Sequence, residues 1–304
     1  MLAQLDSWLQ PIATIPWFYL SLALIIGLLV GSFLNVVIFR LPKMMEQDFR
    51  HDCCEFLGIK AQESQRTEAH NNAPQAVTSL SKPASTCPYC QTKIKPWHNI
   101  PVISYCLLKG RCAYCQHPIS IRYPLVELAT GLLSLLMLWM LGFTTAGLLA
   151  VIFVWVLISL TMIDIDTQLL PDDLTLPLLW LGLIANYFGV YTDIGSALWG
   201  AVIGYLSLWS VFWLFKLLTG KEGMGYGDFK LLAALGAWMG WQLLPLIIVL
   251  SSFVGAAIGI AGIIILGRDK NIPIPFGPYL AIAGWIAFLW GDNITQWYLQ
   301  LMAA

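Results

Sequence analysis

The stretch that decides the fold is AGLLAVIFVWVLISLTMI, residues 146–163, which contains no charged side chain. An α-helix needs about 20 apolar residues to cross the hydrocarbon core of a bilayer, and this run comes close to that length. Similar runs recur along the 304-residue chain, which is 58% hydrophobic and only 11% charged. A soluble globular domain is nearer to a quarter charged. The composition therefore excludes an ordinary soluble domain and predicts an all-α, multi-pass membrane protein.

About eight apolar runs are long enough to be drawn as transmembrane helices. The expected spans are 17–39, 124–142, 146–163, 173–191, 194–218, 229–244, 245–266 and 276–291. A single helix over 229–266 would be about 57 Å long, too long for one crossing, so we expect a boundary at Pro245. No basic region precedes the first apolar run, so we expect this run to be kept as a helix rather than removed as a signal peptide.

The 16 Lys and Arg residues all fall on one side of this arrangement. They lie in or beside the loop 40–123, around the loop between the fifth and sixth spans, or directly after the seventh span. Because Lys and Arg accumulate on the cytoplasmic side, the loop 40–123 is expected in the cytoplasm and both termini outside. By the same parity, the third span ends and the sixth span begins at the cytoplasmic face.

This topology predicts four segments of chain. They are an N-terminal tail with the first span (1–39), the cytoplasmic loop (40–123), a seven-helix membrane core (124–291) and a C-terminal tail (292–304). The cytoplasmic loop itself has two parts. Residues 44–84 are polar and show no sustained apolar period, so we expect a flexible insertion with room for a short helix.

The second part of the loop, residues 85–123, carries two Cys-x-x-Cys pairs separated by 21 residues. Four thiolates at this spacing suit one tetrahedral Zn²⁺, so the predicted ligands are Cys87, Cys90, Cys112 and Cys115. A closed four-cysteine site leaves no position for water or substrate, and its expected role is structural. Disulfides are the weaker alternative, because thiols stay reduced in the cytoplasm.

Several aspartates lie at the ends of apolar spans, where a charge is costly. Capping of a helix N-terminus explains Asp172 and Asp173, which precede the fourth span, and could also explain Asp228 before the sixth. Asp164 does not fit this explanation, because it follows the third span, where the helix dipole disfavours an anion. Asp166 is left open as an exposed loop charge.

Asp164 and Asp228 together suggest an acid–base pair at one face of the membrane. Two carboxylates about 3 Å apart cannot easily both ionise, so they hold one proton between them. The ionised partner can deprotonate a water while the protonated partner donates to a substrate carbonyl, which hydrolyses a peptide without a metal. Gly225 and Gly227 precede Asp228 and would let an extended substrate strand approach closely.

Two other functions stay open on the residues alone. The same acids could bind a cation or relay protons in a transporter or channel. Transport sites usually lie near the bilayer midplane, however, and these acids lie at a boundary. Alternatively, the cysteine loop could dock other proteins, with the acids incidental.

The chain resembles the type IV prepilin peptidases, a family of bifunctional leader peptidases and N-methyltransferases. The segments that carry the resemblance span nearly the whole chain and are GSFLNVVIFRLP (31–42), the two Cys-x-x-Cys pairs, NIPVISY (99–105), RYPLVE (122–127), the stretch 164–172, GYGDFK (225–230) and IPFGP (274–278). Residues 44–84 are longer and less recognisable than the family leads us to expect.

The resemblance implies an intramembrane aspartic protease of the Gly-x-Gly-Asp type in the bacterial inner membrane, with Asp164 and Asp228 as its catalytic residues. It implies prepilin or pseudopilin substrates of pilus biogenesis and type II secretion, whose basic leader is cut at the cytoplasmic face. It also implies methylation of the new N-terminal amine with S-adenosylmethionine. No glycine-rich nucleotide fingerprint assigns the methyl-donor site, and no nucleic-acid partner is expected.

Two further features lack an assigned chemistry. Glu127, at a membrane edge, could tune the acid pair, bind a basic leader or pair with Arg122. Three Gly-x-x-x-Gly motifs, which begin at residues 200, 236 and 255, predict close packing between helices.

Overall fold

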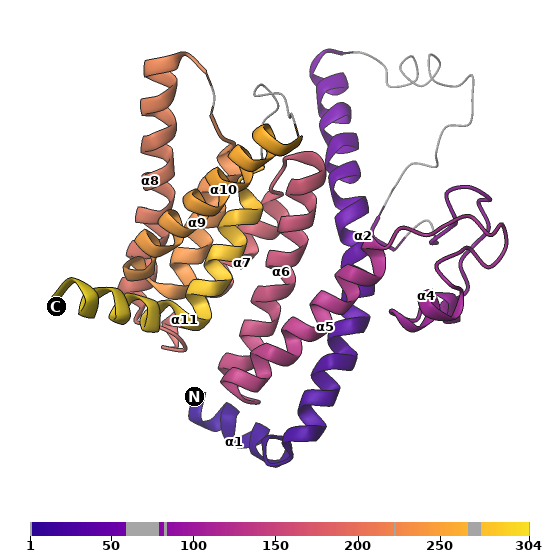
Figure 1. Ribbon diagram of the computed structural model, residues 1–304, viewed down its shortest axis with the longest axis horizontal. Helices are drawn as coiled ribbons and strands as arrows, with labels where there is room; N and C mark the ends of the chain where they lie inside the picture. Colours follow the sequence, from indigo (N-terminus) through magenta and orange to yellow (C-terminus); the bar gives the residue numbers. More distant parts are fainter. Residues whose placement is uncertain (1, 59–78, 82–83, 222, 267–274, 304) are drawn as a thin grey trace. The chain divides into compact units, whose positions relative to one another are not determined.

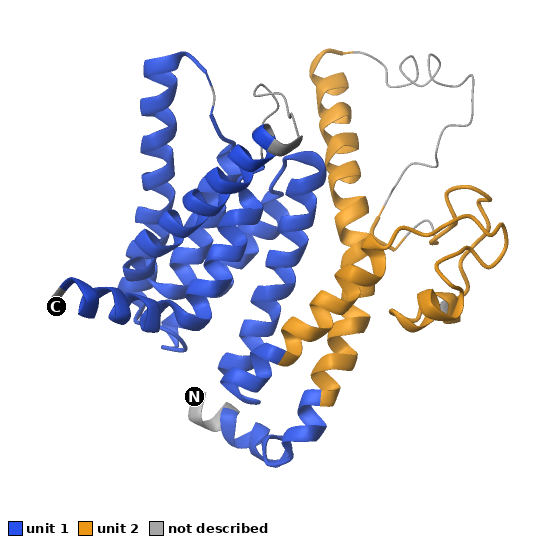
Figure 2. Ribbon diagram, viewed as in Figure 1, with its two compact units in different colours: residues 1–20, 136–304 blue, residues 21–135 orange. Residues whose placement is uncertain are grey.

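The computed structural model describes residues 2–58, 79–81, 84–221, 223–266 and 275–303, which are mostly helical (Figure 1). Within those residues there is no β-strand, only two isolated bridges. The all-α class expected from the sequence is confirmed. The chain divides into two compact units (Figure 2), residues 1–20 with 136–304 and residues 21–135, and both boundaries fall inside helices.

The larger unit contains the first helix and all helices from α6 onward. Their bounds are α1 Leu2–Ala13, α6 Thr145–Thr167, α7 Asp172–Tyr187, α8 Ile194–Thr219, α9 Tyr226–Met239, the 3-10 turn η2 Trp241–Leu243, α10 Leu244–Leu266 and α11 Gly277–Ala303. The smaller unit contains most of α2 Pro16–Phe56 and of α5 Arg122–Leu141. Two short elements lie between them, η1 Pro96–Asn99 and α4 Ile103–Leu107.

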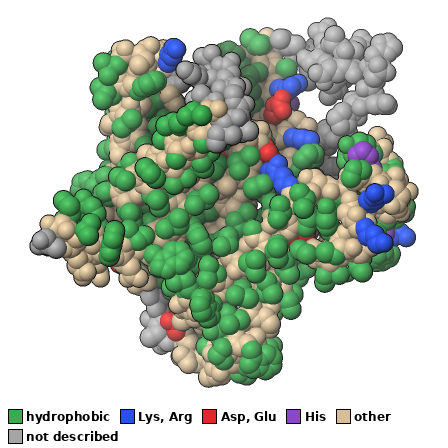
Figure 3. Space-filling model, in the orientation of Figure 1, with side chains coloured by type: hydrophobic (Ala, Val, Ile, Leu, Met, Phe, Trp, Pro, Cys, Tyr) green, Lys and Arg blue, Asp and Glu red, His purple; other side chains and the backbone are tan. Residues whose placement is uncertain are grey.

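Five segments in the described part of the chain are long and apolar enough to cross a membrane. They are α2, α5, α6, α8 and the stretch Trp241–Gly262 of η2 and α10. The other expected spans, 173–191, 229–244 and 276–291, overlap α7, α9 and α11. Eight crossings stay a prediction, because α7 has only 16 residues and α9 only 14. Hydrophobic side chains cover most of the face seen in Figure 3, as expected of a membrane protein.

Helix α9 is almost entirely enclosed by its neighbours. Every residue from Asp228 to Met239 except Lys230 is buried, and α9 packs against α7, α8 and α11. Gly200 of α8 meets Gly236 of α9 backbone to backbone, since a Cβ at either position would lie 2.2 Å from the carbonyl oxygen of the other. The close packing predicted at these two glycine motifs is therefore confirmed.

The break between the sixth and seventh expected spans lies at Gly240 and not at Pro245. Helix α9 ends at Met239, and Gly240 has a φ of 82°, a left-handed value that glycine adopts without steric cost. The turn η2 then leads into α10, where Pro245 is the second residue. Proline is tolerated in the first turn of a helix, so Pro245 starts α10 and does not separate the two helices.

Two helices are longer than the sequence suggested. Helix α2 has 41 residues, about 60 Å, and continues to Phe56 past the expected end at residue 39. An ion pair between Arg50 and Glu46, 2.9 Å apart and one helical turn from each other, supports this extension. The start of the expected flexible insertion is thus helical, whereas its residues 59–78 and 82–83 lie outside the described chain. Likewise, α11 continues through the expected C-terminal tail to Ala303.

Candidate functional site

Asp164 lies in the last turn of α6 and is buried, with 5% of its surface exposed. Its Oδ2 accepts a hydrogen bond from the backbone N–H of Gly277, with an N···O distance of 3.0 Å. Gly277 is the first residue of α11, so the carboxylate lies at the positive end of that helix. This contact offsets the unfavourable C-terminal end of α6 and explains why an acid is kept there.

Gly277 is a site residue that the sequence did not single out. A Cβ at this position would lie 2.6 Å from Oδ2 of Asp164, so only glycine lets the amide approach the carboxylate this closely. Gly277 belongs to the segment IPFGP that supported the resemblance. Its partner is 113 residues away, a pairing that spacing along the chain does not reveal.

Asp228 is the third residue of α9 and is also buried, with 6% of its surface exposed. Its carboxyl accepts a hydrogen bond from the backbone N–H of Gly225, the N-cap residue of α9. Gly225 has no side chain with which to cap the helix, so Asp228 satisfies one of the unpaired amides at this end. The second acid, like the first, is therefore placed at a helix N-terminus.

The structure places Asp164 and Asp228 close enough for their negative charges to repel each other. Leu170, in the connector between α6 and α7, touches the glycine beside each acid. A Cβ at Gly227 would lie 2.6 Å from Cβ of Leu170, and a Cβ at Gly277 would lie 3.2 Å from its Cδ1. Two buried carboxyl groups and the N-terminal turns of two helices thus surround one small region.

The other candidate acids lie at the edge of this site. Asp166 is exposed. Asp172 and Asp173 occupy the first turn of α7, but the N-cap residue is Pro171 and makes no side-chain capping bond. Asp172 instead binds Lys230 of α9, with Nζ 2.6 Å and 2.7 Å from its two carboxylate oxygens. Capping therefore does not account for Asp172, because a lysine ammonium occupies its carboxylate.

The four predicted cysteine ligands also come together, in the smaller unit. All four Sγ atoms lie within 4.8 Å of one another, and none of these cysteines forms a disulfide. The Sγ atoms of Cys87 and Cys115 are 3.8 Å apart. A tetrahedral Zn²⁺ with bonds of about 2.3 Å to sulfur has edges of about 3.8 Å. The cluster can therefore hold one tetrahedral metal ion.

Each Cys-x-x-Cys pair folds into the same tight turn. The N–H of Gln91 donates to the carbonyl of Cys87 at 2.8 Å, and the N–H of Gln116 donates to that of Cys112 at 3.1 Å. Both glutamines have a positive φ, 54° and 58°. The two halves of the cluster are thus built alike, as expected when both serve one metal.

Hydrogen bonds favour the thiolate form that a metal needs at two of the four cysteines, Cys90 and Cys112. Burial and the neighbouring thiols instead raise the pKa of Cys115 to about 11. Bonds from the side chain and the backbone of Thr92 lower the pKa of Cys90 to about 6. Backbone N–H groups of Cys115 and Tyr114 hold the pKa of Cys112 below its usual value. Hydrogen bonds from nearby groups therefore make Cys90 and Cys112 better metal ligands.

Glu127 has a role that the sequence did not suggest. It is 8% exposed, and its Oε2 accepts a hydrogen bond from the N–H of Val102 at 2.8 Å. The hydroxyl of Ser32 on α2 also donates to this carboxyl. Val102 has a φ of 57°, a strained value for a β-branched residue. Within the smaller unit, Glu127 thus ties the cysteine loop to α2 and α5.

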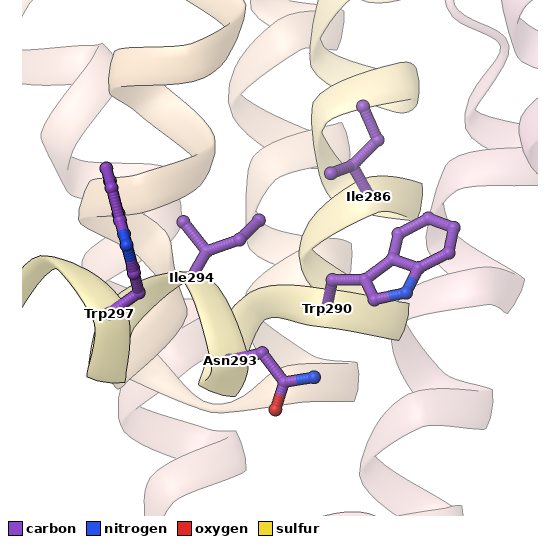
Figure 4. Close-up of a pocket in the computed structure, with 5 residues that line it drawn as sticks. All are labelled: Ile286, Trp290, Asn293, Ile294 and Trp297. Atoms are coloured by element: carbon purple, nitrogen blue, oxygen red, sulfur yellow. The ribbon is translucent and has the colours of Figure 1, made fainter.

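A cavity of about 490 Å³ lies along α11 and does not resemble a catalytic site (Figure 4). Its lining residues are Ile286, Trp290, Asn293, Ile294 and Trp297. None of these side chains is a nucleophile or titrates near neutral pH. This cavity therefore offers no candidate catalytic group.

Comparisons with known proteins agree along the chain. Residues 25–141 match the bacterial peptidase A24 N-terminal domain, and residues 151–260 match the type IV leader peptidase family. The chain is 55% identical to a prepilin leader peptidase/N-methyltransferase of Pseudomonas aeruginosa, across 96% of this chain and 97% of the relative. Proteins of the same name from Aeromonas salmonicida (53% identical, 94% of this chain, 96% of the relative) and Legionella pneumophila (46%, 93% and 96%) are also similar. No solved structure matches the chain.

Proposed function

This chain belongs to the type IV leader peptidase family, and we propose that it is a membrane aspartic endopeptidase with a second, methyl-transferring activity. In this proposal it removes the basic leader from type IV prepilins and pseudopilins at the cytoplasmic face of the bacterial inner membrane. It then methylates the new N-terminal amine with S-adenosylmethionine. The peptidase and the methyltransferase are both part of the name that its relatives carry.

One observation carries the peptidase half of the proposal. Two buried carboxyl groups from separate helices, Asp164 and Asp228, lie at the N-termini of α11 and α9, close enough for their charges to interact. Burial excludes the bulk water that would otherwise solvate two ionised acids, and the helix ends stabilise negative charge there. This environment favours one shared negative charge on the pair, which is the state that an aspartic protease uses.

Hydrolysis by this pair needs no group beyond water. The ionised aspartate takes a proton from a water molecule, whose oxygen adds to the carbonyl carbon of the scissile amide. The protonated aspartate gives its proton to the carbonyl oxygen, which produces a tetrahedral diol. The aspartate that took the water proton then protonates the leaving nitrogen, the other aspartate takes a proton back from the diol, and the C–N bond breaks to give a carboxylic acid and an amine. The pair then again holds one proton, so the cycle closes. Backbone N–H groups at the starts of α9 and α11 stabilise the negative charge throughout.

The start of α9 is open to an extended substrate. Gly225 and Tyr226 are exposed, and a Cβ at Gly225 would meet no atom nearer than 3.9 Å. As far as the described residues are concerned, a peptide strand can therefore approach the backbone beside Asp228 without a side chain in its way. We assign the segment around the scissile bond to this surface.

The distribution of charge supports the proposed cytoplasmic location of the acid pair. All 16 Lys and Arg residues lie on one side of an eight-span topology with both termini outside. In this topology the end of α6 and the start of α9 reach the cytoplasmic side together. A prepilin leader, which is basic and stays in the cytoplasm, would then meet the acid pair where it joins the membrane-embedded helix.

The metal that we propose for the cysteine cluster is a structural Zn²⁺. Cys87, Cys90, Cys112 and Cys115 would hold it and would fill all four positions of a tetrahedral ion. The ion would stabilise the loop and would take no part in hydrolysis. S-adenosylmethionine is the proposed methyl donor, and its site stays unassigned.

The proposal is tested by following leader removal and methyl incorporation together. The full chain is reconstituted in vesicles with a synthetic prepilin and labelled S-adenosylmethionine. Asp164→Asn and Asp228→Asn should each abolish leader removal, whereas Asp166→Asn, at an exposed position near the same helix end, should cut normally. Cleavage at the wild-type rate by Asp228→Asn would overturn the assignment of that residue.

A further inference from the structure

Lys230 and Asp172 join the first turns of α9 and α7. The ammonium of Lys230 lies 2.6 Å and 2.7 Å from the two carboxylate oxygens of Asp172. Their side chains are 28% and 53% exposed. Ion pairs this exposed add little to the stability of a protein, so stability alone does not explain so close a contact.

The position of the pair along the chain is informative. The connector between α6 and α7 starts close to Asp164, where the N–H of Gln168 donates to the Asp164 carbonyl at 2.9 Å. It ends at Asp172, the first residue of α7. The ion pair links this end of the connector to Lys230, two residues after Asp228. The connector and the ion pair together thus join Asp164 to Asp228.

Leu170 packs the connector against the glycines beside the two acids. It lies in the middle of the connector, and its side chain touches the positions of Gly227 and Gly277. If the connector moves, Leu170 moves against both glycines, and these flank Asp228 and contact Asp164. The separation of the two acids therefore depends on where the connector is held.

The start of α9 is also the part of that helix that needs an anchor. From Asp228 onward α9 is buried except at Lys230, whereas Gly225 and Tyr226 at its start are exposed. Asp172 is suited to anchor this end, because it lies in the first turn of α7, which packs against α9, and its carboxylate reaches Lys230.

We propose that Asp172 and Lys230 are positioning residues, whose ion pair sets the separation between the carboxyl groups of Asp164 and Asp228. This inference rests on the proposed peptidase function. Neither residue touches the substrate. The pair acts by keeping the two acids near enough to share one water. Displacements of about 1 Å can cost about 100-fold in rate, so a weak contact can have a large effect on catalysis.

The test compares single variants with a matched neighbour. Lys230→Met and Asp172→Asn should each lower kcat for prepilin cleavage about tenfold and leave KM within about twofold. Asp173→Asn, at the exposed position next to Asp172, should leave both unchanged. A kcat equal to that of the wild type in Lys230→Met would overturn the proposal.

Rescue separates positioning from a general structural role. Lys230→Arg keeps a cation that can bind both carboxylate oxygens and should cut at nearly the wild-type rate. The exchange Asp172→Lys with Lys230→Asp should recover most of the lost kcat. An exchange variant as slow as the single variants would contradict the positioning role of the ion pair. If Lys230→Met does not fold, Asp172→Asn and the exchange decide the question. A wild-type chain that cuts no prepilin would instead refute the proposed function itself.

Discussion

The acid pair and the cysteine cluster are held in place by different means. The acids are held by packed helices, since α9 is buried from Asp228 to Met239 except at Lys230. Around the cysteines there is little to pack. Among residues 84–121 whose burial the structure describes, only Cys87, Pro101, Ser104 and Cys112 are buried. Two of these four residues are proposed metal ligands themselves.

This difference shows what each site needs in order to form. Helix packing positions Asp164 and Asp228, so their geometry is sensitive to small changes of volume between helices. A loop without an apolar core needs another source of stability, and the proposed metal ion would supply it. A change that disrupts the acid pair should therefore leave the cysteine cluster intact, and the reverse should also hold.

The largest expected effect comes from adding one methyl group beside Asp164. Gly277→Ala would place a Cβ 2.6 Å from Oδ2 of Asp164, so either the carboxylate or the start of α11 must move. We expect prepilin cleavage to fall by about 100-fold or more while the protein still inserts and folds. Gly262→Ala is the control, because a Cβ there meets nothing within 4 Å. A Gly277→Ala variant with normal cleavage would show that this contact does not position the acid.

The next effect should be confined to the cysteine loop. Cys112→Ser removes one of four proposed ligands, so bound zinc should fall from about one equivalent to nearly none. Limited proteolysis should then cut between residues 84 and 121, whereas leader removal should stay within about threefold of the wild type. Unchanged zinc content would contradict the assignment of this ligand. Loss of cleavage together with the metal would contradict the independence of the two sites.

A smaller effect, on stability, is expected where α8 meets α9. Gly200→Ala would bring a Cβ 2.2 Å from the carbonyl oxygen of Gly236, and the two backbones would have to separate. Overpacking of this kind costs about 1–3 kcal/mol, so the variant should unfold at a lower temperature or denaturant concentration than Gly262→Ala. Equal stability of these two variants would argue against the close contact.

The smallest effect concerns the start of α6. Oδ1 of Asp6 accepts bonds from the N–H and the hydroxyl of Thr145 at 2.9 Å and 2.8 Å, and these bonds hold the pKa of Asp6 below its ordinary value. Asp6→Asn should lower Tm by about 1–3 °C near neutral pH.

The pH dependence of this difference provides a check. Because the pKa of Asp6 is lowered in the folded state, its contribution is present above the unfolded pKa of about 3.9 and is lost as pH falls through the folded pKa. The melting temperatures of wild type and Asp6→Asn should therefore converge as the pH falls below about 3.9. A constant difference between them would show that the charge of Asp6 is not responsible.

Much of this architecture could be predicted from the sequence, because it depends on local composition. Apolar runs indicated the helices, and the spacing of the two Cys-x-x-Cys pairs indicated the cluster. Asp164 stood out because a helix C-terminus disfavours an anion. The sequence therefore showed that something must compensate its charge, although not what does so.

The remaining features depend on contacts between distant residues. The amide of Gly277 reaches Asp164 only once α11 packs beside α6. Likewise, Asp172 contacts Lys230 only because α7 packs against α9, and this contact replaces the expected capping role. The boundary at Gly240 is not evident from the sequence, because Pro245 is the stronger helix-breaking signal and the positive φ of Gly240 appears only in the structure. The helical extension to Phe56 was missed because its residues are polar and lack an apolar period.

The central claim is that Asp164 and Asp228 act as one unit, and the double variant tests it most directly. Residual rates of leader removal would be measured for Asp164→Asn, Asp228→Asn and the two changes together in the same vesicles. Residues that act as a unit lose nearly all activity when either is removed, so the double variant should be no slower than the slower single variant. Losses that multiply, or a single variant with the wild-type rate, would contradict a shared catalytic pair.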